Sequence, residues 1–156
     1  MGDEAFLPAL LKDMEAAESS IFCAIYMFKT DGERTEPTGL ILSAMIYALS
    51  KGVSVDLLLD IDSSDSYSTK INSETGAVLA RAGANIYYDS PDRRLHTKMC
   101  VIDGYISYIG SHNYTYSAMK RNGEASVRII SPEVASEAIS YIRSYTDEAA
   151  PISILD

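Results

Sequence analysis

Both histidines of this 156-residue chain lie in one stretch, HTKMCVIDGYISYIGSHN, at positions 96–113. The stretch also contains Lys98, Ser111 and Asn113, whose side chains can donate hydrogen bonds to anionic oxygens. Histidine can act beside them as a nucleophile or as a general acid. We call His96, Lys98, Ser111 and Asn113 the anion-binding set. The set suits a phosphate group held without a metal ion, because it lacks the paired carboxylates of glycosidases and the acidic ligands that Mg²⁺ prefers.

The segments around this set are predicted to form a β-hairpin. Two β-prone runs, LHTKMCVID and YISYIGSHNYT, meet at Asp103-Gly104, which is a strong signal for a two-residue turn. Side chains alternate between the faces of a strand. A regular hairpin would therefore place the whole anion-binding set on one surface. Asp103 and His112 would point to the other face, where His112 is either packed or solvated.

The rest of the chain alternates helices with strands. The pattern predicts helices over 5–19, 39–50 (with Thr38 as N-cap), 74–82 and from Pro132 onwards, and further strands over 21–28, 53–60, 84–89 and 124–130. Residues 29–38 and the serine-rich residues 61–73 are expected to be loops. The order predicts an α/β fold, a mixed β-sheet with helices on both faces, in which residues 1–156 form a single domain.

The charge of the chain is uneven. The net charge is −9, which alone disfavours nucleic acid as a partner. Residues 81–128, however, carry 7 basic and 4 acidic side chains, whereas both flanking regions are acidic. The part of the chain that holds both histidines therefore favours a basic, anion-binding face on an acidic body.

The remaining sequence features concern location and cysteine chemistry. No apolar run reaches the roughly 18 residues of a membrane-spanning helix, and the acidic N-terminus does not resemble a signal peptide. We therefore expect a cytoplasmic protein without stable membrane insertion. Cys23 and Cys100 lie in apolar runs and are interpreted as buried free thiols, since two cysteines and two histidines are too few for a familiar zinc cluster.

The spacing of the motif resembles the HKD signature of the phospholipase D superfamily at each fixed position, His96-x-Lys98-x4-Asp103-x6-Gly110-Ser111-x-Asn113. The match extends more weakly to AIYMF, KGVSVDLLLD and RAGANIYYD before the motif and to Asn122-x-Glu124 after it. The length is similar to that of small single-motif members typified by a bacterial endonuclease. Two features depart from the family: the polar insertion GERTEPT and the marked acidity.

The resemblance implies a phospholipase D-like fold and covalent catalysis. In that family a motif histidine, here His96, attacks the phosphorus and forms a phosphohistidine, without a metal or other cofactor. Lys98 and Asn113 would bind the phosphate oxygens, with support from Ser111. Glu124 would accept a hydrogen bond from His96 and fix its tautomer. Asp103 and Gly110 would be structural residues of the motif.

The mechanism needs a second histidine, and we expect it to come from a second subunit. His112 occupies the variable position of the motif and is predicted to point away. A two-fold homodimer would bring two copies of His96 into one composite active site. The favoured substrate is nucleic acid, with Arg93, Arg94, Lys120 and Arg121 as candidate contacts to flanking phosphates.

Two alternatives remain open from the sequence. One is a phospholipase or phosphatidyl transferase that acts on lipid phosphodiesters. The other is a nucleic-acid-binding subunit of a larger complex with little activity alone.

Overall fold

The computed structural model describes residues 1–30, 36–62 and 66–146. In chain order, the elements are α1 (Asp3–Ala16), β1 (Ser20–Ile25), α2 (Pro37–Ser50), β2 (Ser54–Leu59), α3 (Tyr67–Arg81), β3 (Asn85–Tyr88), β4 (Lys98–Ile102), β5 (Ile106–Gly110), α4 (Tyr116–Lys120), β6 (Ser126–Ile130) and α5 (Pro132–Thr146). The predicted α/β class is confirmed.

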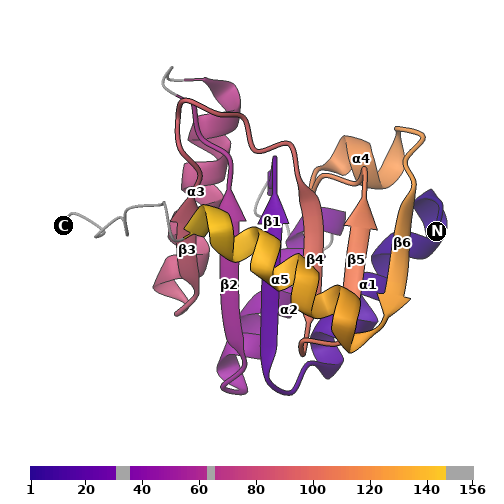
Figure 1. Cartoon of the computed structure of the whole chain (residues 1–156). Helices are drawn as coiled ribbons and strands as arrows, with labels where there is room; N and C mark the ends of the chain where they lie inside the picture. Colours follow the sequence, from indigo (N-terminus) through magenta and orange to yellow (C-terminus); the bar gives the residue numbers. More distant parts are fainter. Residues whose placement is uncertain (31–35, 63–65, 147–156) are drawn as a thin grey trace.

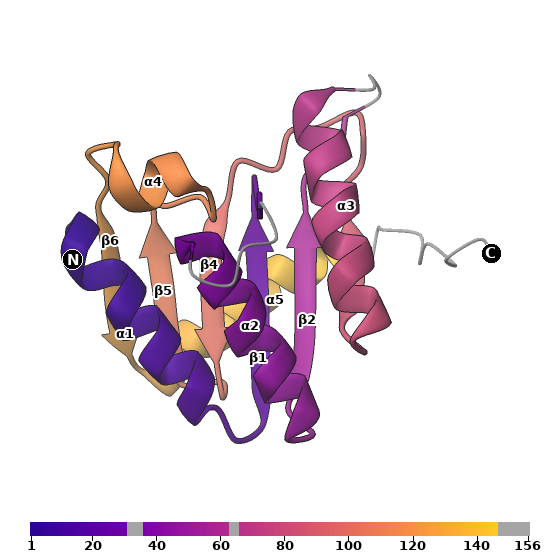
Figure 2. The ribbon, with the colours of Figure 1, turned by 180° about the vertical axis from the view of Figure 1, so that it is seen from behind.

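The strands form one six-stranded mixed sheet in the order β3-β2-β1-β4-β5-β6. β1 pairs with β2, and β2 with β3, in parallel; β4, β5 and β6 continue the sheet in antiparallel pairs. Helix α5 crosses one face of the sheet (Figure 1). The view from behind shows α1, α2 and α3 over the other face (Figure 2). Helices on both faces agree with the sequence-based prediction.

The two faces of the sheet bury separate apolar clusters. On the side of α1 and α2, the larger cluster includes Leu10, Met14 and Leu57. On the α5 side, Phe22 and Leu58 pack with Ile142. Strand β1 is buried on both faces, which explains why its sequence is an unbroken apolar run rather than an alternating one.

Two helix boundaries differ from the prediction. Helix α2 begins at Pro37 with Glu36 as N-cap, so Thr38 already lies within the helix; proline suits the first turn because its missing N–H has no intrahelical role there. Helix α3 begins at Tyr67, and its N-cap Ser66 accepts a hydrogen bond from Thr69 N–H. The loop predicted over 61–73 is therefore wrong from residue 67 onwards. The first part of the GERTEPT insertion lies outside the described residues.

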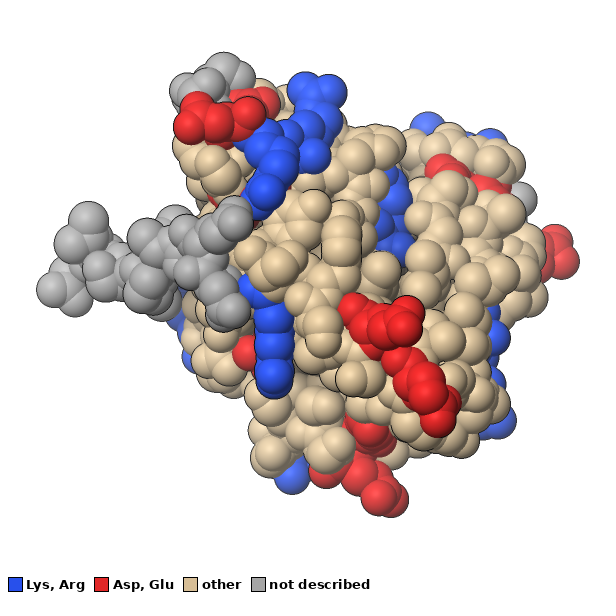
Figure 3. Space-filling view, in the orientation of Figure 1, with Lys and Arg blue, Asp and Glu red and all other residues tan. Residues whose placement is uncertain are grey.

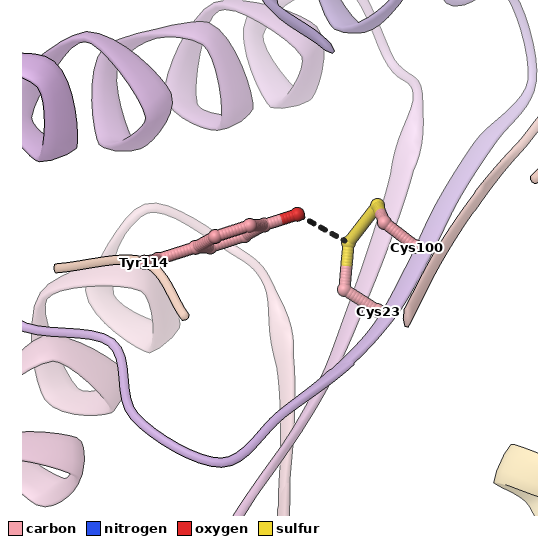
Figure 4. Close-up of a disulfide and its surroundings, with 3 residues drawn as sticks. All are labelled: Cys23, Cys100 and Tyr114. Atoms are coloured by element: carbon pink, nitrogen blue, oxygen red, sulfur yellow. Dashed lines mark hydrogen bonds between the residues drawn. A yellow bond between two sulfur atoms is a disulfide. The ribbon is translucent and has the colours of Figure 1, made fainter. Parts of the chain in front are cut away.

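The prediction of free thiols is also wrong, because Cys23 and Cys100 form a disulfide (Figure 4). The two residues are register partners in the antiparallel pair of β1 and β4. Directly opposed positions of such a pair hold their β-carbons close together. The phenol oxygen of Tyr114 lies 4.0 Å from Cys23 Sγ (Figure 4).

The β4–β5 turn changes the expected register. Ile102 pairs with Ile106, so the loop holds the three residues 103–105 and not two. Asp103 and Gly104 both adopt positive φ, 54° and 63°. The extra residue reverses the relative parity of the two strands, so Lys98 shares a sheet face with Cys100 and Tyr108. The prediction that strand alternation gathers the anion-binding set on one sheet face is therefore wrong.

Candidate active site at one edge of the sheet

The motif residues come together at an edge of the sheet, where strands begin and end. His96 lies two residues before β4, which begins at Lys98, and Ser111 directly follows the last residue of β5. Glu124 lies two residues before β6. Asn113 precedes Tyr114, which forms a bridge with Phe28 beyond the end of β1. This is the upper edge in Figure 1, and we call it the reactive edge.

His96 is an exposed side chain beside an aromatic ring. The centroid of its imidazole lies 4.8 Å from that of Tyr26. The backbone N–H of Tyr26 donates to Thr97 O at 2.8 Å, which fixes the two segments side by side. Although the side chain is exposed, partial burial lowers the pKa of His96 below its ordinary value of 6.5, and the positive charges of Lys98 and Arg94 lower it further. The neutral imidazole, which is the nucleophilic form, is thereby favoured.

Lys98 is buried below His96. Its ammonium group donates to the carbonyl oxygen of His96 at 2.8 Å and lies 4.9 Å from the centroid of the Tyr26 ring. Burial lowers the pKa of Lys98, and the negative charges of Glu124 and Asp60 oppose that shift. The Glu124 carboxylate also accepts a hydrogen bond from Asn122 Nδ2 at 3.0 Å. The Lys98 ammonium and the Glu124 carboxylate therefore attract each other electrostatically beside His96.

The Gly110-Ser111 pair joins the end of β5 to the start of β6. Ser111 Oγ accepts from the N–H of Ala125 at 3.0 Å, and Ser111 N–H donates to Ala125 O at 3.0 Å. A β-carbon on Gly110 would collide with Ala125 O and with Ser126 Oγ. The glycine therefore permits the close approach that brings the segment after β5 next to Glu124.

The side chain of Asn113 is half-buried at the reactive edge. Its Oδ1 is buried and has no hydrogen-bond partner within the described part of the chain. A buried amide oxygen without a partner is costly unless a ligand satisfies the group. Because this oxygen is an enclosed acceptor, a phosphate oxygen would have to be bound through the amide nitrogen of Asn113, which is a donor.

His112 lies in the core and not at the exposed surface. Its ring stacks on that of Phe6 in α1, with centroids 4.0 Å apart and planes inclined by 7°. Its Nδ1 lies 2.8 Å from Ser126 Oγ. His112 is packed rather than solvated, but the prediction that it lies on the opposite face from Lys98 is wrong, because both side chains line one small cavity.

Asp103 lies at the opposite edge of the sheet from His96. Its carboxylate accepts hydrogen bonds from the backbone N–H groups of Glu18, Ser19 and Ser20 and from Ser19 Oγ, at 2.8–3.0 Å. Burial would raise the pKa of Asp103, but these hydrogen bonds outweigh it and hold the pKa below its ordinary value of 3.8. The carboxylate thus ties the β4–β5 turn to the α1–β1 connection.

Two residues of the site were not identified from the sequence, Tyr26 and Asp60. Tyr26 contacts both His96 and Lys98 through its ring. Asp60 is buried at the end of β2, where Oδ1 accepts the N–H of Leu95 at 2.7 Å and so positions the residue before His96. Burial raises the pKa of Asp60, against the Leu95 hydrogen bond and the charge of Arg94. An acidic residue that closes a buried parallel strand was the available signal for Asp60.

The wider surroundings of the site are partly basic. Arg93, Arg94, Lys120 and Arg121 are all exposed, in the segment before His96 and in the segment from the end of α4. Figure 3 shows basic side chains near the top of one face and in a hollow of it, with acidic side chains also at the top and both signs of charge over the lower half. Among residues 1–30, 36–62 and 66–146, no group of three or more His, Cys, Asp or Glu residues could hold a metal ion. No helix in the same ranges is both long and apolar enough to cross a membrane.

The amino-acid sequence of the chain is similar to a known protein family and to individual proteins. The sequence profile of the family described as "Cardiolipin synthase, PLD-like domain" matches residues 10–146. A phospholipase D from Rickettsia conorii is 28% identical over 141 residues, which cover 90% of this chain and 62% of the relative. The chain therefore spans somewhat less than two thirds of that relative.

Two solved structures share the fold over nearly the whole chain. Nuc from Salmonella typhimurium, a phospholipase D family member, is similar with a TM-score of 0.77 and 22% identity, covering 92% of this chain and 88% of Nuc. NucT from Helicobacter pylori is similar with a TM-score of 0.74 and 18% identity, covering 96% of this chain and 92% of NucT. These similarities agree with a six-stranded mixed sheet flanked by helices.

Proposed function

The chain belongs to the family of phospholipase D-like domains, and on that premise we propose that it is a phosphodiesterase that cleaves nucleic acid without a metal cofactor. The observation that carries the proposal is the composition of the reactive edge. An exposed His96 with a lowered pKa lies beside the Lys98 ammonium, which interacts electrostatically with Glu124. This combines a nucleophile with a cation that can stabilise the charge on phosphoryl oxygens.

The proposed reaction has two displacements at phosphorus. In the first, a ring nitrogen of His96 forms a bond to phosphorus while the bond to the leaving oxygen breaks, and a second histidine donates a proton to that oxygen. In the second, the same histidine accepts a proton from water, the water oxygen bonds to phosphorus and the phosphorus–nitrogen bond breaks. Lys98 and Asn113 bind the phosphoryl oxygens, and Ser111 holds the segment that carries Asn113.

Glu124 has a positioning role in this proposal. A hydrogen bond from one ring nitrogen of His96 to the Glu124 carboxylate would leave the other nitrogen unprotonated and ready to attack. The electrostatic interaction between Glu124 and Lys98 supports this role for Glu124. It shows that the carboxylate lies near the Lys98 ammonium, which in turn donates to the carbonyl oxygen of His96.

The second histidine is proposed to be His96 of another subunit. His112 is unsuited to this role, because it is buried against Phe6 and Ser126. The chain has no third histidine. A homodimer with a two-fold axis next to the reactive edge would place two copies of His96 in one composite site.

The choice of nucleic acid rests on charge near the site. The exposed Arg93 and Arg94 precede His96, and Lys120 and Arg121 lie close to the start of β6 along the chain. A phosphate backbone would contact such groups on both sides of the reacting phosphorus. A lipid phosphodiester is the second candidate substrate, and the observation that favours it is the phospholipase D name of the Rickettsia relative.

The test is incubation with labelled single- and double-stranded DNA, RNA and a phosphatidyl lipid, all in EDTA. We expect cleavage of at least one nucleic acid, no loss of rate in EDTA, and none of this activity in His96→Ala. Activity that EDTA removes and Mg²⁺ or Zn²⁺ restores would contradict the phosphohistidine mechanism. Cleavage of the lipid alone would replace nucleic acid by a phospholipid as the substrate.

A further inference from the structure

Pairs of a cation and an aromatic ring gather around the reactive edge. Within the described residues there are five such pairs, and four lie at this edge: Lys98 with Tyr26, Arg93 with Tyr145, Arg121 with Tyr116 and Lys29 with Tyr67. Only Lys51 with Tyr47 lies elsewhere, at the far end of α2. A surface that alternates positive charge with aromatic faces is suited to a polyanion that also carries planar groups.

The most continuous of these features runs from His96 to the last turns of α5. Thr97, the neighbour of His96, has its Oγ1 3.5 Å from the phenol oxygen of Tyr141. The phenol oxygens of Tyr141 and Tyr145 are 2.9 Å apart, and their ring centroids are 5.0 Å apart. The guanidinium carbon of Arg93 lies 4.1 Å from the Tyr145 ring centroid. We call Arg93, Tyr141 and Tyr145 the tyrosine shelf.

The shelf is held in place from below. The buried Asp89 accepts hydrogen bonds from Arg93 Nη2 at 2.6 Å and Nε at 3.3 Å, which fixes the plane of the guanidinium. Ile142, between the two tyrosines along the chain, is fully buried against the sheet. The upper side remains open, since the Arg93 side chain is 42% exposed and Tyr141 is 43% exposed. Tyr141 is therefore the accessible ring of the shelf, whereas Tyr145 is half-buried against the apolar cluster and holds Arg93 over its face.

We propose that the tyrosine shelf is a base-stacking subsite for single-stranded nucleic acid, next to the scissile phosphate. The proposal rests on the proposed nuclease function and narrows its substrate class. In a duplex the bases are already stacked on one another, so their faces are not available to Tyr141 and Tyr145. In a single strand, a base adjoining the phosphate at His96 can stack on the shelf while Arg93 and Arg94 face the backbone.

The path of a bound single-stranded nucleic acid follows from the positions of the other cation–aromatic pairs. Helix α4, which holds Tyr116 and is followed by Arg121, contacts α1 and α2, so it lies on the opposite face of the sheet from α5. The reactive edge lies between α4 and the end of α5 (Figures 1 and 2). A single strand would therefore cross the edge of the sheet from the α4 side to the tyrosine shelf, with the reacting phosphate at His96.

The test measures binding separately from chemistry. Fluorescence anisotropy with full-length His96→Ala protein and a labelled single-stranded oligonucleotide gives the dissociation constant without cleavage. Adding Tyr141→Ala and Tyr145→Ala should weaken binding roughly tenfold, as expected for the loss of stacking. The double Tyr→Phe variant should bind like the parent. Tyr105→Ala is the matched control, because Tyr105 is also 43% exposed but lies in the β4–β5 turn at the opposite edge.

An abasic oligonucleotide of the same length isolates stacking from phosphate contacts. The Tyr→Ala pair should leave the affinity for this probe unchanged, and circular dichroism should show that it remains folded at the assay temperature, with a lower melting midpoint than the Phe pair because Tyr145 packs against the apolar cluster. Equal loss of affinity for the normal and abasic strands would overturn the proposal. So would loss of affinity for phosphatidylcholine vesicles without loss for the oligonucleotide. Hydrolysis of bis(p-nitrophenyl) phosphate by the unmodified protein tests the proposed chemistry independently, so that failure of either idea is recognised separately.

Discussion

At the scale of single residues, environment separates two side chains of the same type. His96 is exposed, adjoins Tyr26 and feels the charges of Lys98 and Arg94. His112 is enclosed by Phe6 and Ser126. The first environment leaves a ring nitrogen accessible to a substrate, whereas the second uses the imidazole to fill the core beneath the motif.

Exchanging each histidine for alanine should therefore have opposite effects on activity and stability. His96→Ala should lower phosphodiester turnover by at least about a thousandfold, because the nucleophile is lost, with little change in stability. His112→Ala should retain most turnover below its melting temperature but lower the free energy of unfolding by about 2–4 kcal/mol, since it leaves a cavity. Steady-state kinetics and urea denaturation measure the two effects. Inverted roles for the two histidines would disprove the assignment of His96.

The protonation of His96 can be measured directly. Because burial, Lys98 and Arg94 all disfavour the imidazolium, its NMR titration midpoint should lie below 6.5. Arg94→Gln removes one positive charge and should raise that midpoint. His96→Ala identifies the signal, since only two histidines are present. A midpoint at or above 6.5 in the parent protein would show that burial and the charges of Lys98 and Arg94 do not act on His96 in this way.

At the scale of elements, the ends of strands position the chemistry. The segments before β4 and β6 and after β1 and β5 meet at the reactive edge, and backbone hydrogen bonds such as Tyr26 N–H to Thr97 O join them. At the other edge, Asp103 fastens the β4–β5 turn to the connection between α1 and β1. The motif thus spans the full length of a hairpin, with its histidine at one edge and its aspartate at the other.

Asp103→Ala should lower the free energy of unfolding by about 3 kcal/mol, because several backbone N–H groups lose their acceptor. The pKa of Asp103 is lowered by folding, so its contribution should be complete above about pH 4 and decline as the pH falls through the folded pKa. Urea denaturation of parent and variant at several pH values measures this. Glu137→Ala, on the exposed surface of α5, is the control. A difference that grew as the pH fell would contradict the described contacts.

At the scale of the whole molecule, one subunit supplies the proposed nucleophile, His96, but not the second histidine that the proposed reaction needs as an acid. The described residues place one histidine at the reactive edge and the other in the core. A second copy of the edge is the simplest source of the missing acid, and a two-fold axis supplies it with the same residues. The proposed function therefore requires association of two chains.

Subunit mixing tests this requirement. When parent and His96→Ala proteins are mixed in equal amounts and allowed to exchange, only about a quarter of the dimers keep both copies of His96. Activity should then fall from half of the all-parent value to about a quarter. Sedimentation should show a dimer at the assay concentration. Activity that stays at half, or a fully active monomer, would rule out a shared site.

The sequence by itself determined the class of fold and the order of the motif residues, because hydrophobic periodicity, turn residues and fixed spacing are local properties. It also indicated which part of the chain is basic. Strand alternation failed to place His112, since one extra residue in the β4–β5 turn reverses the parity and His112 lines the same small cavity as Lys98. The loop prediction failed for residues 67–73 because Ser66 is the N-cap of α3, so that the helix begins within the serine-rich segment.

Only the tertiary structure decided which distant segments become neighbours. The pairing of β1 with β4 brings Cys23 to Cys100 and Tyr26 to His96, and neither contact follows from the spacing of these residues along the chain. The end of β2 likewise brings Asp60 to Leu95. Strand order is set by the burial of apolar faces over the entire sheet, which is a non-local property. The chemical type of each side chain, by contrast, is given directly by the residue at its position in the sequence.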